Sequence, residues 1–256
     1  MQAPRAGPGT VQTTLLPMKQ LLTLSVLAAA LAQPALAGDL SALGTLSAAE
    51  FRTVSEDLGA AFSYKPLAPT ESQGLTGFDL GVELTGTDIS RSAAALRKAG
   101  ASDSPMNTLM VSRVHAHKGL PLGFDVAAFL GNVSALNVNV VGAEVRYALL
   151  DGGVATPAVG VRGAYTHMNG ASQLSLRTRS LDVSVSKGFA MLTPYAGIGQ
   201  VWVDSSPGAG SLGAENLSLG KLFAGLNVNL GLLNLAFEAD QTGSTTSWGA
   251  KLGLRW

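Results

Sequence analysis

Two histidines separated by one residue, His115 and His117, are the residues whose type and spacing most directly suggest chemistry. On an extended strand, residues i and i+2 point to the same face, so both imidazoles share a face with Arg113. Paired imidazoles could ligate a transition metal, but such a site needs further ligands. No third ligand lies near them in the sequence, so we predict neither a metal site nor a cofactor and interpret the pair as part of a polar wall.

Nucleophilic catalysis by a serine and a histidine is the alternative chemistry for these residues. The remaining histidine, His167, has no telling neighbour, and the chain contains no G-x-S-x-G motif. The sequence therefore predicts that the protein is not an enzyme.

Charged side chains recur on one face of segments in which polar and apolar residues alternate. In residues 76–85, for example, Asp79 and Glu83 oppose Phe78, Leu80 and Val82. This period of two is typical of strands with one apolar and one polar face. The residues predicted to lie on the polar, inner face are Asp79, Glu83, Arg113, His115, His117, Asp125, Glu144, Arg146, Arg162, Asp182, Lys221, Glu238, Lys251 and Arg255.

The composition suggests a membrane protein. Hydrophobic residues make up 46% of the 256 residues, the mean hydropathy is +0.28, and only 13% of residues are charged. Beyond the N-terminus no stretch of about 18 consecutive apolar residues exists, which a spanning helix would need. A membrane location is therefore compatible only with a β-barrel. The absence of cysteine excludes a disulfide scaffold and a lipoprotein anchor.

The N-terminus is expected to carry a secretory signal peptide. Residues 18–37 contain a basic start at Lys19, an apolar run, and small residues before Gly38, so cleavage is expected after Ala37. Residues 1–17 show no such pattern and are interpreted as a mis-assigned extension. Removing Arg5 and Lys19 leaves 15 basic and 17 acidic residues, a net charge near −2, so no nucleic-acid partner is predicted.

One amphipathic helix is predicted within residues 38–75. Ser47 and Glu50 form a capping-box pattern, and an apolar face follows at spacings of three and four: Phe51, Val54, Leu58 and Phe62. The segment is interpreted either as a plug in the periplasmic mouth or lumen, or as a periplasmic cap over one end of the barrel.

About ten strands are predicted between residues 76 and 256, with eight or twelve also compatible. Their expected ranges are 76–89, 108–119, 122–131, 136–150, 156–168, 173–189, 193–205, 216–231, 232–241 and 245–256. Short joins alternate with longer ones, which is typical of a closed antiparallel transmembrane barrel. A soluble β-sandwich is disfavoured because its polar faces would be rich in Lys and Glu.

The last segment, residues 248–256, is predicted to be a lipid-facing strand. Trp248, Leu252, Leu254 and Trp256 share its apolar face, and the two tryptophans lie roughly 20 Å apart in depth, as an aromatic girdle requires. With this terminal signature, residues 76–256 resemble bacterial outer-membrane β-barrel proteins, and the resemblance implies that the barrel-assembly machinery reads the last strand during insertion. Residues 142–147 and 192–195 are also similar to barrel proteins of proteobacteria, a similarity that implies no activity.

These patterns predict a barrel of the bacterial outer membrane whose partner is membrane lipid. Its many interior glycines and its helix favour passive or gated passage of small or hydrophobic solutes. The inner charges nearly cancel and could pair across a narrow lumen, which favours the alternative, a non-conducting structural or surface-interaction barrel. The sequence indicates neither a solute nor an oligomeric state.

Overall fold

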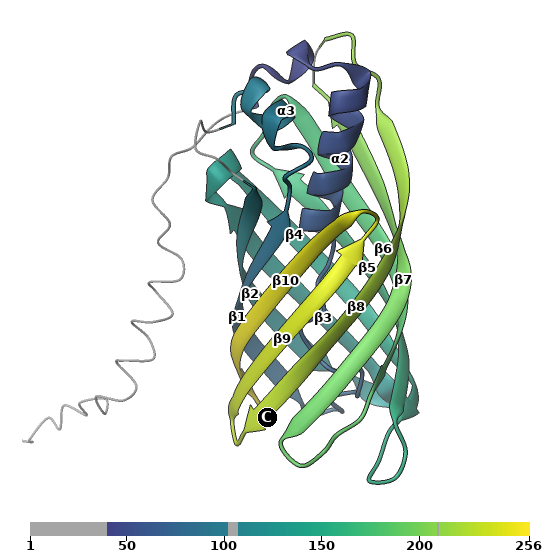
Figure 1. Ribbon diagram of the computed structural model, residues 1–256. Helices are drawn as coiled ribbons and strands as arrows, with labels where there is room; N and C mark the ends of the chain where they lie inside the picture. The colour runs from purple at the N-terminus through teal and green to yellow at the C-terminus, as the bar shows by residue number, and fades with distance from the viewer. Residues whose placement is uncertain (1–39, 102–106, 209) are drawn as a thin grey trace, which may run out of the picture. The chain divides into compact units, whose positions relative to one another are not determined.

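The protein forms a closed antiparallel β-barrel of ten strands (Figure 1). The computed structural model describes residues 40–101, 107–208 and 210–256. The expected N-terminal extension and signal peptide lie outside these residues. Each strand pairs with its sequence neighbours, and β1 closes the barrel against β10. The predicted fold class and the strand number of ten are therefore confirmed.

The strands agree with the predicted ranges to within about three residues. They are β1 (Phe78–Asp88), β2 (Thr108–Gly119), β3 (Phe124–Val133), β4 (Val138–Asp151), β5 (Ala158–Asn169), β6 (Leu174–Ser186), β7 (Leu192–Pro207), β8 (Glu215–Leu230), β9 (Leu233–Thr242) and β10 (Thr245–Arg255).

The two ends of the barrel differ in their connections. At the terminal end, where β1 begins and β10 ends, the turns are short; Gly231, for example, adopts a φ of 69° between β8 and β9. The opposite end, here called the loop end, carries the two longest connections, 89–107 and 208–214. The first of these contains α3 (Ala93–Lys98), which the sequence analysis treated as loop. Tertiary packing decides this case, because Leu96 is fully buried against the core and Ser92 binds a neighbouring helix.

The predicted amphipathic helix is α2 (Ala48–Phe62), preceded by the short 3₁₀ turn η1 (Leu43–Thr45). The capping box is present, since Ser47 Oγ accepts from Glu50 N–H and the Glu50 carboxylate accepts from Ser47 N–H. Two further 3₁₀ turns, η2 (Pro121–Gly123) and η3 (Ser134–Leu136), join strands. None of the helices in the described part of the chain is long and apolar enough to span a membrane.

The helix α2 lies inside the barrel at the loop end (Figure 1). It contacts strands all round the wall, including β1, β5, β6, β7, β8 and β10. From the sequence, the helix was expected either as a plug in the periplasmic mouth or lumen or as a periplasmic cap. In the structure it lies within the barrel, at the end opposite the start of β1, and residues 63–77 then run through the barrel to β1.

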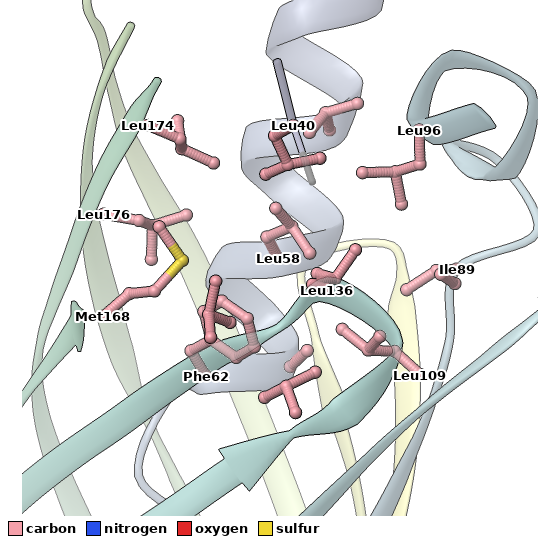
Figure 2. Packing of buried hydrophobic residues seen from close by; sticks show 14 of the residues in the cluster. Leu40, Leu58, Phe62, Ile89, Leu96, Leu109, Leu136, Met168, Leu174 and Leu176 are labelled. Carbon is pink, nitrogen blue, oxygen red and sulfur yellow. The ribbon is translucent and has the colours of Figure 1, made fainter. Parts of the chain in front are cut away.

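The half of the lumen nearest the loop end, which surrounds α2 and is here called the upper lumen, is mainly apolar. Inward-facing side chains of the wall pack against Leu58 and Phe62, among them Leu109, Leu136, Met168, Leu174 and Leu176 (Figure 2). The sequence analysis expected a polar inner face along the whole barrel, and this expectation is wrong for the loop end. There the inner face of the wall packs against a helix instead of water, so its inward side chains are apolar. Each of the four buried side chains on the predicted face of α2 contributes about 1.5–3 kcal/mol to folding.

Candidate functional site: a filled lumen

The charged residues predicted on the inner face all point into the barrel. Thirteen of the fourteen are buried, and Arg255, at the end of β10, is half-buried. They line the lower lumen, between α2 and the terminal end. The alternation that placed them is enforced because a strand of a closed barrel has only two sides, one toward lipid and one toward the interior.

Several of these charges pair with strand neighbours and not across the lumen. Arg162 lies 2.7 Å from Asp182, its register partner, and 3.5 Å from Glu144, which also accepts from Arg146 at 2.9 Å. Lys251 Nζ lies 2.7 Å from Asp79 Oδ2. Such pairs neutralise the wall and leave other groups to bind what fills the lumen.

His115 and His117 face carboxylates. His115 Nδ1 lies 3.2 Å from Glu83 Oε1, and His117 Nε2 lies 3.8 Å from Asp125 Oδ2. Within the described ranges, no group of three His, Cys, Asp or Glu side chains could hold a metal ion. The two imidazoles therefore contribute to the polar wall, and their ring nitrogens make no hydrogen bond to the described residues.

The helix α2 is fixed to the wall by buried polar contacts. Asp57 accepts hydrogen bonds from Arg91 Nη2 at 2.6 Å, from Ser92 N–H at 3.1 Å and from Thr245 Oγ1 at 2.8 Å. On another side, Ser55 Oγ lies 2.8 Å from Ser205 Oγ. Nearby, Gly59 packs so closely on Val203 that any side chain at this position would clash. The helix is therefore held at several points around its circumference.

The C-terminal end of α2 points down the lumen, where two cations meet its last carbonyl groups. Lys65 Nζ donates to Ala60 O at 3.0 Å, and Arg113 Nη2 donates to Ala61 O at 3.2 Å. Cations at a helix C-terminus are favourable because the carbonyl groups there carry partial negative charge. Arg113 is also stacked over the Phe129 ring, 4.5 Å from its centroid.

Residues 63–77, here called the strap, fill the lower lumen below α2. Wall groups bind the strap backbone along its length: Lys221 Nζ donates to Tyr64 O at 2.6 Å, Glu238 accepts from Leu67 N–H at 3.1 Å, and Arg146 donates to Pro69 O at 2.6 Å. Lys65 forms a fully buried ion pair with Asp240 at 2.7 Å. Further down, Asp125 accepts from Ser72 Oγ and Gln73 N–H. The predicted lumen residues thus bind the chain's own backbone.

Five functional residues were missed by the sequence analysis: Asp57, Lys65, Arg91, Tyr195 and Asp240. Asp240 shares the parity of Glu238 on a predicted strand, so alternation could have identified it. Tyr195 also faces inward, where its hydroxyl donates to Glu238 at 3.0 Å. Lys65 and Asp57 had no such signal, because Asp240 lies 175 residues from Lys65 and Thr245 lies 188 residues from Asp57 in the sequence.

The outer face of the barrel is apolar. Outward-pointing side chains on β10 include Trp248, Leu252 and Leu254, and Trp256, the residue after β10, also points outward. Both tryptophans are about half exposed. The backbone of Trp256 exchanges two hydrogen bonds with Phe78, at 2.8 and 3.0 Å, and the two rings lie 5.0 Å apart. A closed barrel with an apolar outer band and a charged interior is the architecture of outer-membrane proteins. This protein is therefore a transmembrane β-barrel of the outer-membrane type.

Comparisons with known proteins add a likeness in fold. No protein-family model matches the chain, and no curated protein sequence matches it. Among solved structures, it is similar to the KdgM porin at 8% identity and a TM-score of 0.36, over 69% of this chain and 98% of the porin. It is also similar to the translocator domain of the autotransporter NalP from Neisseria meningitidis, at 11% identity and a TM-score of 0.38, over 85% of this chain and 99% of that domain. Neisserial surface protein A is similar at 9% identity and a TM-score of 0.30, over 70% of this chain and 95% of that protein. At these identities the likenesses concern the fold alone.

Proposed function

We propose that the protein is a non-conducting outer-membrane barrel, sealed by its own N-terminal segment, with a structural or surface-interaction role and no enzymatic activity. The observation that carries this proposal is the filling of the lumen along its length. The helix α2 occupies the apolar upper half, and the strap occupies the charged lower half. A solute or a hydrated ion would have to displace one of them to pass.

The energetics of the lower lumen also support a sealed state. Withdrawing the strap would remove the ion-pair partner of Asp240, and it would remove the carbonyl groups that accept from Lys221 and Arg146. Leaving a buried charge without its partner costs about 3–5 kcal/mol, although water entering the emptied lumen would recover part of it.

Gated passage is the second candidate, and a different observation favours it. Below α2, the strap is bound mainly by hydrogen bonds and ion pairs, which water can replace, and several inward polar atoms, including Glu144 Oε2 and Asp79 Oδ1, lack a hydrogen bond to the described residues. The lower lumen is thus suited to hydration if the segment moves.

Single-channel conductance in a planar bilayer separates the two candidates. The protein, purified from membranes and shown to be folded by its heat-dependent gel mobility, is expected to be silent. A variant lacking residues 40–66 is expected to conduct, because both α2 and the upper strap are gone. A folded deletion variant that stays silent would contradict the sealing role of the segment.

A reversible crosslink tests whether the segment moves. The chain has no cysteine, and Ser55 and Ser205 have their hydroxyl oxygens 2.8 Å apart, so the double variant Ser55→Cys, Ser205→Cys can tie α2 to β7. A sealed barrel is silent whether this disulfide is oxidised or reduced. Openings that occur after reduction and vanish after oxidation would overturn the sealed barrel in favour of gated passage. The single Ser205→Cys variant is the control.

A further inference from the structure

The outer wall carries two arginines and a histidine close together at the loop end, here called the outer arginine patch: Arg177, Arg179 and His167. Arg177 and Arg179 lie two residues apart on β6 and share its outward face, with both side chains exposed. In the strand register, Arg177 lies between His167 of β5 and Asp204 of β7. The structure describes the residues of all ten strands, and no other arginine among them faces outward. The remaining strand arginines, Arg113, Arg146, Arg162 and Arg255, point into the lumen.

The patch lies immediately beyond the apolar part of the wall. From the terminal end, the outward residues of β6 are Val185, Val183 and Leu181, followed by Arg179, Arg177 and Ser175. The neighbouring strands change close to this level: on β5 Gly163 is followed by Tyr165, opposite Arg179, and on β7 Ile198 is followed by Gln200, opposite Leu181. The patch therefore lies where hydrocarbon gives way to lipid headgroups.

The same region is built for an interface. Tyr165 and Trp202 flank Arg179 in register on the two neighbouring strands, and both rings are partly exposed on the outer face. Tyrosine and tryptophan at this depth are typical of the membrane–water boundary. Beyond them, toward the loop end, the outward residues Asn169, Ser175 and Ser206 are polar. They could bind hydroxyl groups of a headgroup.

The charge of the patch is not balanced. Arg179 Nη2 lies 3.0 Å from Asp204 Oδ2 in a solvent-exposed pair. Arg177 has no ion-pair partner among the residues that the structure describes. An arginine facing lipid is costly unless it lies near the interface, and its planar guanidinium matches a phosphate with two parallel hydrogen bonds.

Outer-membrane barrels carry their longer loops on the cell exterior, which assigns the loop end to the outer leaflet. From this geometry we propose that β5, β6 and β7 form a binding site for the phosphate-bearing headgroup of an outer-leaflet membrane lipid. Arg177 binds the phosphate oxygens directly. Arg179, whose pair with Asp204 is exposed and weak, contributes a second contact from the same face. The acyl chains lie along the apolar outward residues below, where a shallow groove of about 310 Å³ is lined by Val159, Val183, Val185 and Ile198.

The test measures binding of lipid A, a phosphorylated glycolipid, to the purified protein in detergent by native mass spectrometry. Arg177→Gln is expected to weaken binding about tenfold, and adding Arg179→Gln is expected to weaken it further, because each removes a charge-assisted contact. Arg97→Gln is the matched control: it removes the same charge at the same end of the barrel, from α3 and not from the wall. This control is expected to bind like the unchanged protein.

Three results would overturn the proposal. Equal binding by the folded double variant would remove the site, and equal loss in the Arg97→Gln control would indicate a general charge effect. Binding of inorganic phosphate as tight as binding of lipid A would indicate a simple anion site without a lipid component. If the double variant does not fold, Arg177→Gln decides the matter, since Arg177 forms no ion pair with the described residues.

Discussion

At the scale of single residues, the first carboxylate of α2 has a perturbed acidity. The backbone N–H of Ser47, and then the side chains of Lys98 and Ser47, lower the pKa of Glu50 from 4.5 to about 2. Glu50 lies at the exposed loop end, outside the strands. Because its ionised form caps the helix that fills the upper lumen, its titration reports on how that helix is held.

The stability that Glu50 contributes is expected to be lost only in strong acid. A carboxylate whose pKa is lowered by folding stabilises the folded state fully above its unfolded pKa of 4.5 and loses this contribution as the pH falls through about 2. The difference in thermal stability between the unchanged protein and Glu50→Gln should thus be constant above about pH 5 and vanish near pH 2. A difference that does not depend on pH would contradict the role of the charge.

A second residue, Asp57, connects α2 to the wall through three partners. Asp57→Asn keeps the shape of the side chain but removes the charge that Arg91 binds. It also replaces one carboxylate oxygen, an acceptor, with an NH₂ group, a donor, which then faces the donors of Ser92, Arg91 or Thr245. The cost is expected to be about 1–3 kcal/mol, measured as a lower midpoint of urea unfolding in vesicles. Glu56→Gln is the comparison: its half-buried carboxylate lies 3.2 Å from the same Arg91, and because this pair is more exposed, the variant should lower the midpoint by less than Asp57→Asn.

At the scale of elements, pairs of aromatic and glycine residues fix the register of neighbouring strands. Phe129 lies directly opposite Gly142, and Tyr195 lies opposite Gly225. A side chain added at either glycine would clash with the facing ring. Each aromatic ring thus lies over the glycine opposite it. Because only glycine leaves room for the ring, this contact favours one register of the two strands.

A methyl group at such a glycine is expected to disturb the barrel. Gly225→Ala would meet the rigid Tyr195 ring and the Phe237 carbonyl group, so we expect a loss of about 1–3 kcal/mol. Gly163→Ala provides the control, because nothing lies near the added atom. Urea unfolding measures both. Equal midpoints for the two variants would show that the ring yields easily and does not set the register.

The elements also show where sequence patterns are sufficient. Alternation predicted the strands and the direction of Arg162, Asp182 and the other inner charges. Each barrel strand has one face toward lipid and one toward the interior, and successive side chains alternate between these faces. It failed at the loop end, where Leu109 and Val203 face inward against α2. A single sequence does not contain the pairing of Lys65 with Asp240 or of Asp57 with Thr245, since both depend on which strands surround the helix.

At the scale of the whole molecule, the chain crosses the barrel before its first strand begins. Residue 40 lies near the loop end, next to the turns at Leu136 and Gly170, whereas β1 starts at the terminal end. Outer-membrane barrels have short periplasmic turns and longer outer loops. We therefore assign the loop end, and with it η1 and the start of α2, to the cell exterior.

Cysteine labelling on intact cells tests this orientation in a chain without native cysteine. Thr45→Cys, in η1, should react with a membrane-impermeant maleimide added outside, because Thr45 is exposed at the loop end. Val154→Cys, in the fully exposed turn between β4 and β5, should react only after the cells are opened. Labelling in the reverse order would show that the barrel has the opposite orientation.

The passage of the N-terminal segment through the lumen also constrains the order of folding. Once β1 has paired with β10, the hydrogen-bonded wall is closed around residues that were synthesised first, and threading them in afterwards would require the packed lumen to empty. The segment must therefore be enclosed while the ring is still open. The final zipping of Phe78 against Trp256 is then the step that traps it, and exchange of the α2 amide hydrogens should be governed by reopening of that seam.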